Sequence, residues 1–74
     1  MKIALLKQDA ILLADAGIAY DESKEYSEDE ALDLLDAVRE VEVSYSQFDR
    51  GSKADLYFRY GLIADRIYAQ IPEN

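Results

Sequence analysis

Apolar residues in the middle of the chain recur with the spacing of a helix. Between residues 31 and 48 they follow one another in steps of three and four, which places them on one helical face. We call this face the seam; it consists of Ala31, Leu34, Val38, Val41, Tyr45 and Phe48, and Leu35 widens it. The pattern predicts an amphipathic helix that buries the seam and ends near Phe48.

A second amphipathic helix is predicted between Ser52 and Ile71. Pro72 disfavours helical geometry in the residue before it, so this helix should stop at Ile71. Gly61 lowers helix stability by about 1 kcal/mol relative to alanine, and we therefore expect another helix to cross closely at Gly61 and Ala64. The apolar face again follows steps of three and four, and consists of Tyr57, Tyr60, Ala64, Ile67 and Ile71, with Leu56 and Ile63 beside it.

The N-terminal segment predicts a shorter helix with an ambiguous start. Gly17 is typical of a left-handed cap and places the end of this helix at Ala16. The helix can begin at Ile3 or Leu6; alternatively, residues 2–6 are an extended lead-in that docks on the other helices. The apolar residues that would share one face of the longer version are Ile3, Leu6, Ala10 and Leu13.

Two capping signals mark where the longer helices begin. Ser27-Glu28-Asp29-Glu30 has the form of a capping box, in which the Ser27 hydroxyl accepts from the Glu30 N–H and the Glu30 carboxylate accepts from the Ser27 N–H. Ser52-Lys53-Ala54-Asp55 is a second such signal, directly after a tight turn over residues 49–52. Because this turn is short, we expect the two long helices to form an antiparallel hairpin. The connection over residues 17–26 has no helical period.

These patterns predict an all-α fold. We expect one domain spanning residues 1–74, a small three-helix bundle in which the antiparallel hairpin of the second and third helices is covered by a shorter first helix. The sequence contains no cysteine and no histidine, so no disulfide or zinc site of the usual ligands can support the core. Packing alone must hold the domain together, or self-association must complete it.

The charge balance restricts the expected partners. Sixteen acidic residues outnumber eight basic ones, giving a net charge of −8, whereas direct binding to nucleic acid needs a basic face. No apolar run reaches the roughly 18 residues of a membrane span. The apolar run near the N-terminus is broken by Lys7, Gln8 and Asp9, so we expect no secretory signal. The expectation is a cytoplasmic protein that binds neither nucleic acid directly nor membranes.

The sequence offers no catalytic, metal-binding or cofactor-binding constellation. Without histidine and cysteine, the commonest general base, the thiol nucleophile and the usual zinc ligands are missing. Gly17, Gly51 and Gly61 are isolated and form no phosphate-binding loop. A bundle of this size rarely encloses a substrate cavity. We therefore expect a non-enzyme without a small-molecule substrate.

Two features of the outward faces are candidates for contact with a partner. Opposite the seam lies the acidic stripe, Asp29, Asp33, Asp36 and Glu40, which is either a solvated face or a docking strip for a basic surface. Apolar residues also fall outside the seams: Leu32 and Val43 on the second helix, and Phe58 and Leu62 on the third. The second pair is flanked by Arg59, Asp65 and Arg66.

Either the first helix or the 17–26 connection covers one of these apolar pairs, or the pairs form a contact surface. Arg59 and Arg66 give the third helix a basic edge that could meet the acidic stripe of another copy, as in a homodimer. We therefore expect a non-enzymatic interaction or accessory module, which binds a protein partner or itself. The alternative is an acidic inhibitor or mimic that occupies a basic site on a nucleic-acid-binding protein.

Overall fold

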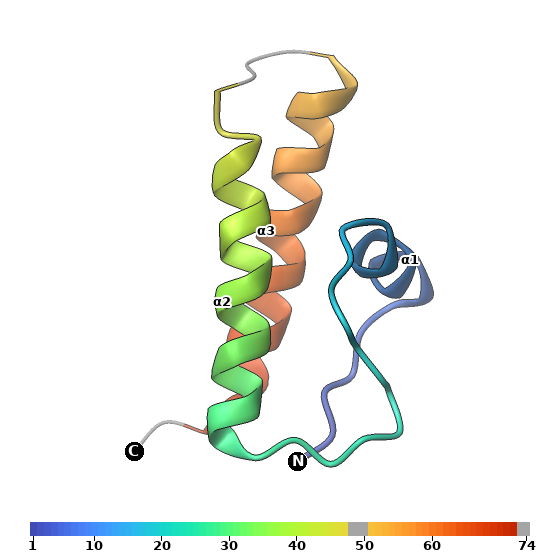
Figure 1. Ribbon diagram of the computed structural model, residues 1–74, viewed down its shortest axis with the longest axis vertical. Helices are drawn as coiled ribbons and strands as arrows, with labels where there is room; N and C mark the ends of the chain where they lie inside the picture. Colours follow the sequence, from blue (N-terminus) through green and yellow to red (C-terminus); the bar gives the residue numbers. More distant parts are fainter. Residues whose placement is uncertain (48–50, 73–74) are drawn as a thin grey trace.

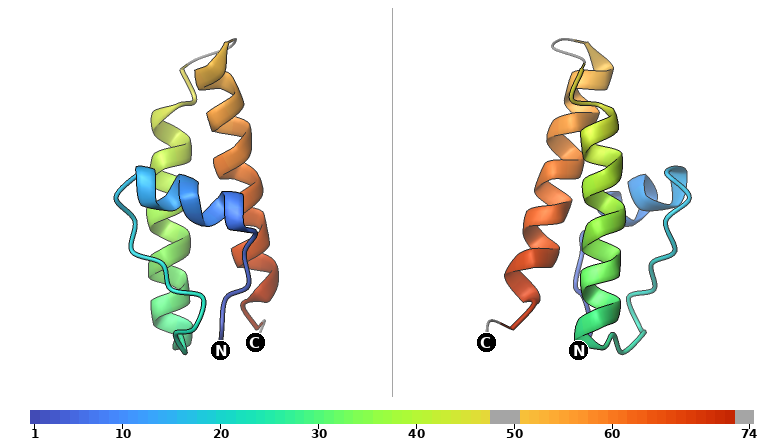
Figure 2. Two further views of the ribbon diagram at one scale, coloured as in Figure 1. Left: turned by 90° about the vertical axis from the view of Figure 1, so that its right-hand side faces the viewer. Right: turned by 60° about the vertical axis from the view of Figure 1, so that its left-hand side comes forward.

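Three α-helices form the protein, as the computed structural model shows for residues 1–47 and 51–72 (Figure 1). They are α1 (Lys7–Asp15), α2 (Glu28–Ser44) and α3 (Ser52–Gln70), and no strand occurs in the described part of the chain. The two long helices run antiparallel and pack most extensively on each other, while α1 lies across them (Figure 2). This confirms the predicted all-α bundle, with an α2–α3 hairpin covered by a shorter helix.

The capping box at the start of α2 is present as predicted. The Ser27 hydroxyl accepts from the Glu30 N–H at 3.1 Å, and the Glu30 carboxylate accepts from the Ser27 N–H at 3.0 Å. Lys24 adds an ion pair to Glu30 at 2.8 Å. The hydrogen bond from Lys24, with those from Ser27, lowers the pKa of Glu30 to about 2. This start of α2 is therefore fixed by the sequence of one turn and by the connection before it.

The end of α2 comes earlier than the seam predicts, at Ser44. The hydroxyls of Ser44 and Ser46 donate to the carbonyls of Val41 and Val43 at 2.6 and 2.7 Å. Such local bonds offer the backbone carbonyls an alternative to the helical ladder. Tyr45 is the C-cap and turns follow it. The predicted end at Phe48 and the first half of the predicted turn over residues 49–52 lie outside the described residues.

Helix α3 differs from its predicted bounds by one residue at each end. Its N-cap is Gly51, whose φ of 88° favours glycine, so Ser52 is the first helical residue rather than the cap. The helix ends at Gln70, and Ile71 is already extended with ψ 126°, as expected of a residue before proline. The close approach predicted at Gly61 is made by a side chain: a Cβ added there would lie 3.0 Å from the Glu42 carboxylate of α2.

The N-terminal residues follow the extended alternative rather than the longer helix. Leu6 is the N-cap of α1 and has an extended backbone. Ile3 is fully buried in the core although it lies outside the helix. Placing Leu6 on the buried face is wrong, because the lead-in does not continue the helical repeat and leaves this side chain 48% exposed.

The core lies between the hairpin and the side that carries α1 and its flanking segments. Tyr60 is buried, stacks on Tyr45 with ring centroids 5.9 Å apart, and donates its hydroxyl to the Leu12 carbonyl at 2.8 Å. Tyr57, predicted in the buried face, is instead 38% exposed, because it lies at the edge of that face. The buried apolar residues are Ile3, Leu13, Tyr26, Ala31, Leu34, Leu35, Val38, Tyr60, Ile63, Ala64 and Ile67.

Within the described residues, no helix combines the length and the hydropathy needed to cross a membrane.

Candidate interaction surface

A set of polar contacts attaches α1 and the lead-in to one side of the hairpin. Asp9 is only 3% exposed and binds the Arg66 guanidinium of α3 at 2.6 Å. The Asp9 carboxylate also accepts from the Leu6 N–H at 3.1 Å, which holds the start of α1. Gln70 donates to the Ala4 carbonyl at 2.8 Å and accepts from the Ala4 N–H at 2.7 Å. Arg66, predicted as a partner contact, therefore already binds within the fold.

Asp9, which binds Arg66 and helps to hold α1, was not predicted as an important residue from the sequence. It lies four residues before the buried Leu13, so both side chains are on the same face of α1. That spacing was the available signal, because a carboxylate on a buried stripe needs a partner. Its partner is 57 residues away in the sequence, and nothing local points to Arg66.

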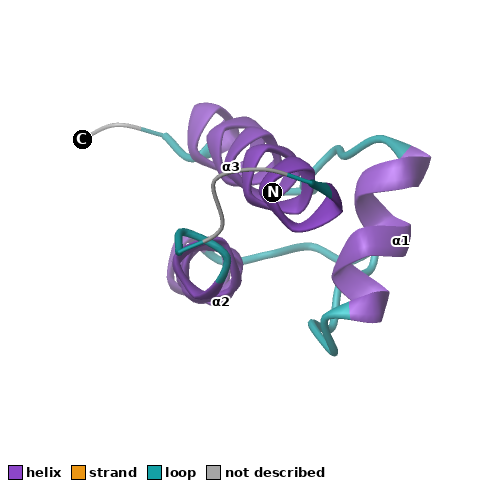
Figure 3. Ribbon diagram, turned by 90° about the horizontal axis from the view of Figure 1, so that it is seen from above, coloured by secondary structure: helices purple, strands orange, loops and turns teal. Residues whose placement is uncertain are grey.

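The opposite side of the α2–α3 hairpin, which we call the outer face, is not covered by any element of the described chain. Figure 3 shows α1 on one side of the two long helices and neither helix nor connection packed on the other. Both predicted apolar pairs are exposed: Leu32 is 40% and Val43 is 67% exposed on α2, and Phe58 is 72% and Leu62 is 50% exposed on α3. Neither α1 nor the 17–26 connection buries either pair.

A groove on the outer face joins the two helices. It has a volume of about 190 Å³ and is lined mainly by apolar atoms. The Arg39 guanidinium of α2 bridges the helices beside it, binding Glu42 at 3.0 Å and Asp65 at 3.4 Å. The hydrogen bond to Glu42 raises the pKa of Arg39 above its ordinary value. The residues that line the groove are Glu42, Tyr57, Phe58, Gly61, Leu62 and Asp65.

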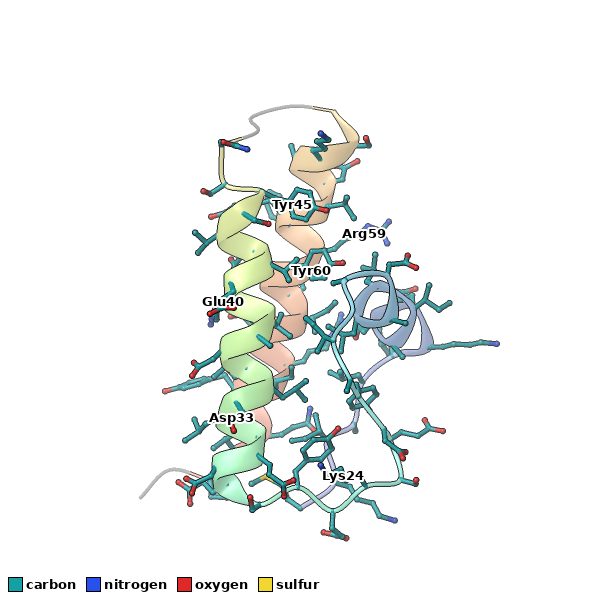
Figure 4. The ribbon with its side chains drawn as sticks, in the orientation of Figure 1. Lys24, Asp33, Glu40, Tyr45, Arg59 and Tyr60 are labelled. Carbon is teal, nitrogen blue, oxygen red and sulfur yellow. The ribbon has the colours of Figure 1, made fainter. Side chains whose placement is uncertain are left out.

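Part of the acidic stripe lies beside Arg39 and Val43 on α2. Asp36 and Glu40 line a shallow hollow together with Arg39 and Val43. Asp33 instead borders a groove of about 390 Å³ between α2 and the 17–26 connection. Figure 4 shows Asp33 and Glu40 along α2 and Arg59 beside α1. All four stripe residues are exposed, and within residues 1–47 and 51–72 none of them forms an ion pair.

Arg59 does not lie with the stripe or with Phe58. It lines a groove between α1 and α3, together with Gln8, Leu12 and Arg66. Leu62 borders both this groove and the one on the outer face. The structure thus separates the predicted contact residues into an apolar outer face and a basic groove in which one of the two arginines already binds Asp9.

Among the residues that the structure describes, no three side chains of the His, Cys, Asp or Glu type are grouped so as to hold a metal ion.

In the comparisons with known proteins, no family model, no curated protein and no solved structure matches this chain.

Proposed function

We propose that this chain is a non-enzymatic protein-interaction module that binds its partner through the outer face. The observation that carries the proposal is the exposure of Phe58, at 72%, beside Leu62 on a helix face that no other element of the described chain covers. Single exposed apolar residues are common on protein surfaces. Here three of the exposed large apolar residues, Tyr57, Phe58 and Leu62, line one groove of the hairpin, and a cluster of this kind is typical of a contact surface.

The composition of the outer face also fits a binding surface. Its centre is apolar, and Arg39 beside the groove already binds both Glu42 and Asp65. Burying a side chain such as Phe58 or Val43 completely contributes about 1.5–3 kcal/mol. Pre-paired charges reduce the cost of removing water from the rim of such a surface.

A cytoplasmic setting is part of this proposal, and fractionation of the native cells tests it.

Affinity capture with matched variants tests the proposed function. The wild-type chain, Val43→Ser/Phe58→Ser and the control Ile11→Ser are immobilised and exposed to lysate of the native cells. Ile11 is 55% exposed on α1, away from the outer face. The proposal predicts proteins that are retained by the wild type and by Ile11→Ser but lost from the double variant. Equal retention by all three chains, each shown to be folded by circular dichroism, would contradict it.

The unpaired acidic stripe supports a second candidate, an acidic mimic that occupies a basic site on a nucleic-acid-binding protein. In that case charge supplies the affinity, so replacing the stripe by Asn and Gln should abolish retention, and retention should fall steeply with salt. Retention that survives this replacement and about 0.5 M salt would exclude the mimic. Retention through the apolar outer face would persist under the same salt.

A further inference from the structure

We infer that the outer face binds a basic amphipathic helix of a partner protein. This inference rests on the proposed function and specifies the chemistry of the partner. It follows from the shape of the groove, the apolar side chains that line it, and the charges at its border.

The shape of the outer face favours a helix. The groove lies over the junction of two antiparallel helices, with Phe58 and Leu62 on one wall and Glu42 on the other. A third helix packs naturally on such a junction, as apolar residues at helical spacing fit between the side chains of the pair. The hairpin already accepts α1 and the lead-in on its other side (Figure 2).

The charges at the border favour a basic helix over a second copy of this chain. Asp36 and Glu40 lie beside Val43 on the α2 edge, and within the described residues neither of them forms an ion pair. Arg39 offers little to an acidic partner because Glu42 and Asp65 already bind it. A second copy would bring its own net charge of −8 and its own acidic stripe to the interface. A helix with lysine or arginine residues beside an apolar stripe would complement both the acidic border and the apolar groove.

The test uses the whole chain and a synthetic peptide of about 18 residues, a length of roughly five helical turns. The peptide carries leucine on one helical face and lysine on the other, and a scrambled peptide of the same composition lacks the apolar face. Binding is followed by fluorescence anisotropy. We expect the wild-type chain to bind the amphipathic peptide at least about tenfold more tightly than the scrambled one, since the apolar contacts carry most of the affinity.

Two pairs of variants separate apolar contact from general charge attraction. Val43→Ser/Phe58→Ser should weaken binding by about tenfold or more, while Ile11→Ser should not. Asp36→Asn/Glu40→Gln should weaken it several-fold, by an amount that shrinks at high salt. The control Asp15→Asn/Glu22→Gln removes the same charge from exposed positions in α1 and the 17–26 connection and should leave binding nearly unchanged.

Equal binding of the two peptides, or equal losses from the two charge-removing variants, would overturn the inference. A second result would also overturn it: the chain binds no peptide but self-associates in sedimentation, and Val43→Ser/Phe58→Ser abolishes this self-association. The occupant of the outer face would then be a second copy of the chain. Such results would leave the proposed function standing if capture from the lysate still depended on Val43 and Phe58. Loss of that dependence would refute the proposed function itself.

Discussion

At the scale of single residues, the contact between Asp9 and Arg66 is one of those that hold α1 on the hairpin. The two atoms lie 2.6 Å apart, and the carboxylate is almost completely buried while the arginine remains 38% exposed. A charge-assisted hydrogen bond of this kind contributes more than a neutral one, and removal of one partner leaves the other incompletely satisfied. The lead-in residue Leu6 depends on the same carboxylate.

We expect Asp9→Asn to lower the free energy of unfolding by about 1–2 kcal/mol. Urea unfolding at neutral pH measures this effect. Asp65→Asn is the matched control, because Asp65 also meets an arginine of the hairpin but is 71% exposed and 3.4 Å from it. The control should change the free energy by less than about 0.5 kcal/mol. Equal losses from the two variants would show that the Asp9 pair does not hold α1.

At the scale of elements, the start of α2 is fixed by groups that lie within a few residues of one another. Ser27, Glu30 and Lys24 form the network that lowers the pKa of Glu30 from its ordinary 4.5 to about 2. Because the pKa is lower in the folded chain, ionised Glu30 stabilises the fold fully above about pH 4.5. This contribution is lost as the pH falls through about 2.

We expect a pH titration followed by NMR to place the midpoint of the Glu30 carboxyl near 2. Lys24→Gln should raise this midpoint toward 4.5, since the hydrogen bond from Lys24 is the largest cause of the shift. Lys7→Gln, which removes the same charge from α1, should leave it unchanged. A Glu30 midpoint that stays the same in Lys24→Gln would show that this ion pair does not form in solution.

The elements that the sequence predicted well are those with local causes. The capping box fixes the start of α2, the seam gives its buried face, and Pro72 fixes the end of α3 within one residue. The end of α2 depends on how serine hydroxyls compete for backbone carbonyls, which the periodicity does not record. The extended lead-in depends on contacts such as that of Gln70 with Ala4, which are 66 residues apart.

The candidate site was predicted in part for the same reason. Helical spacing placed Leu32, Val43, Phe58 and Leu62 outside the seams, and the structure leaves all four exposed. That Phe58 and Leu62 line a groove together with Glu42 follows only from the packing of α2 on α3. The position of Arg66 was not predictable, because its partner Asp9 is brought to it by α1 from a distant part of the sequence.

At the scale of the whole molecule, α1 covers one side of the hairpin, and no described element covers the other (Figure 3). Phe58 is the most exposed of the large apolar residues in the described chain, so its removal should hardly affect folding. Substitutions at such positions usually change the free energy of unfolding by less than about 0.5 kcal/mol. Loss of function without loss of stability would therefore mark Phe58 as a binding residue.

Photo-crosslinking in the native cells tests most directly whether the outer face meets a protein. The cross-linker is introduced as Phe58→p-benzoylphenylalanine and, as the control, Ile11→p-benzoylphenylalanine, since both side chains are exposed but lie on opposite sides of the fold. We predict a discrete protein adduct from position 58 and none from position 11. A discrete adduct from position 11 alone, or none from either position, would contradict the account.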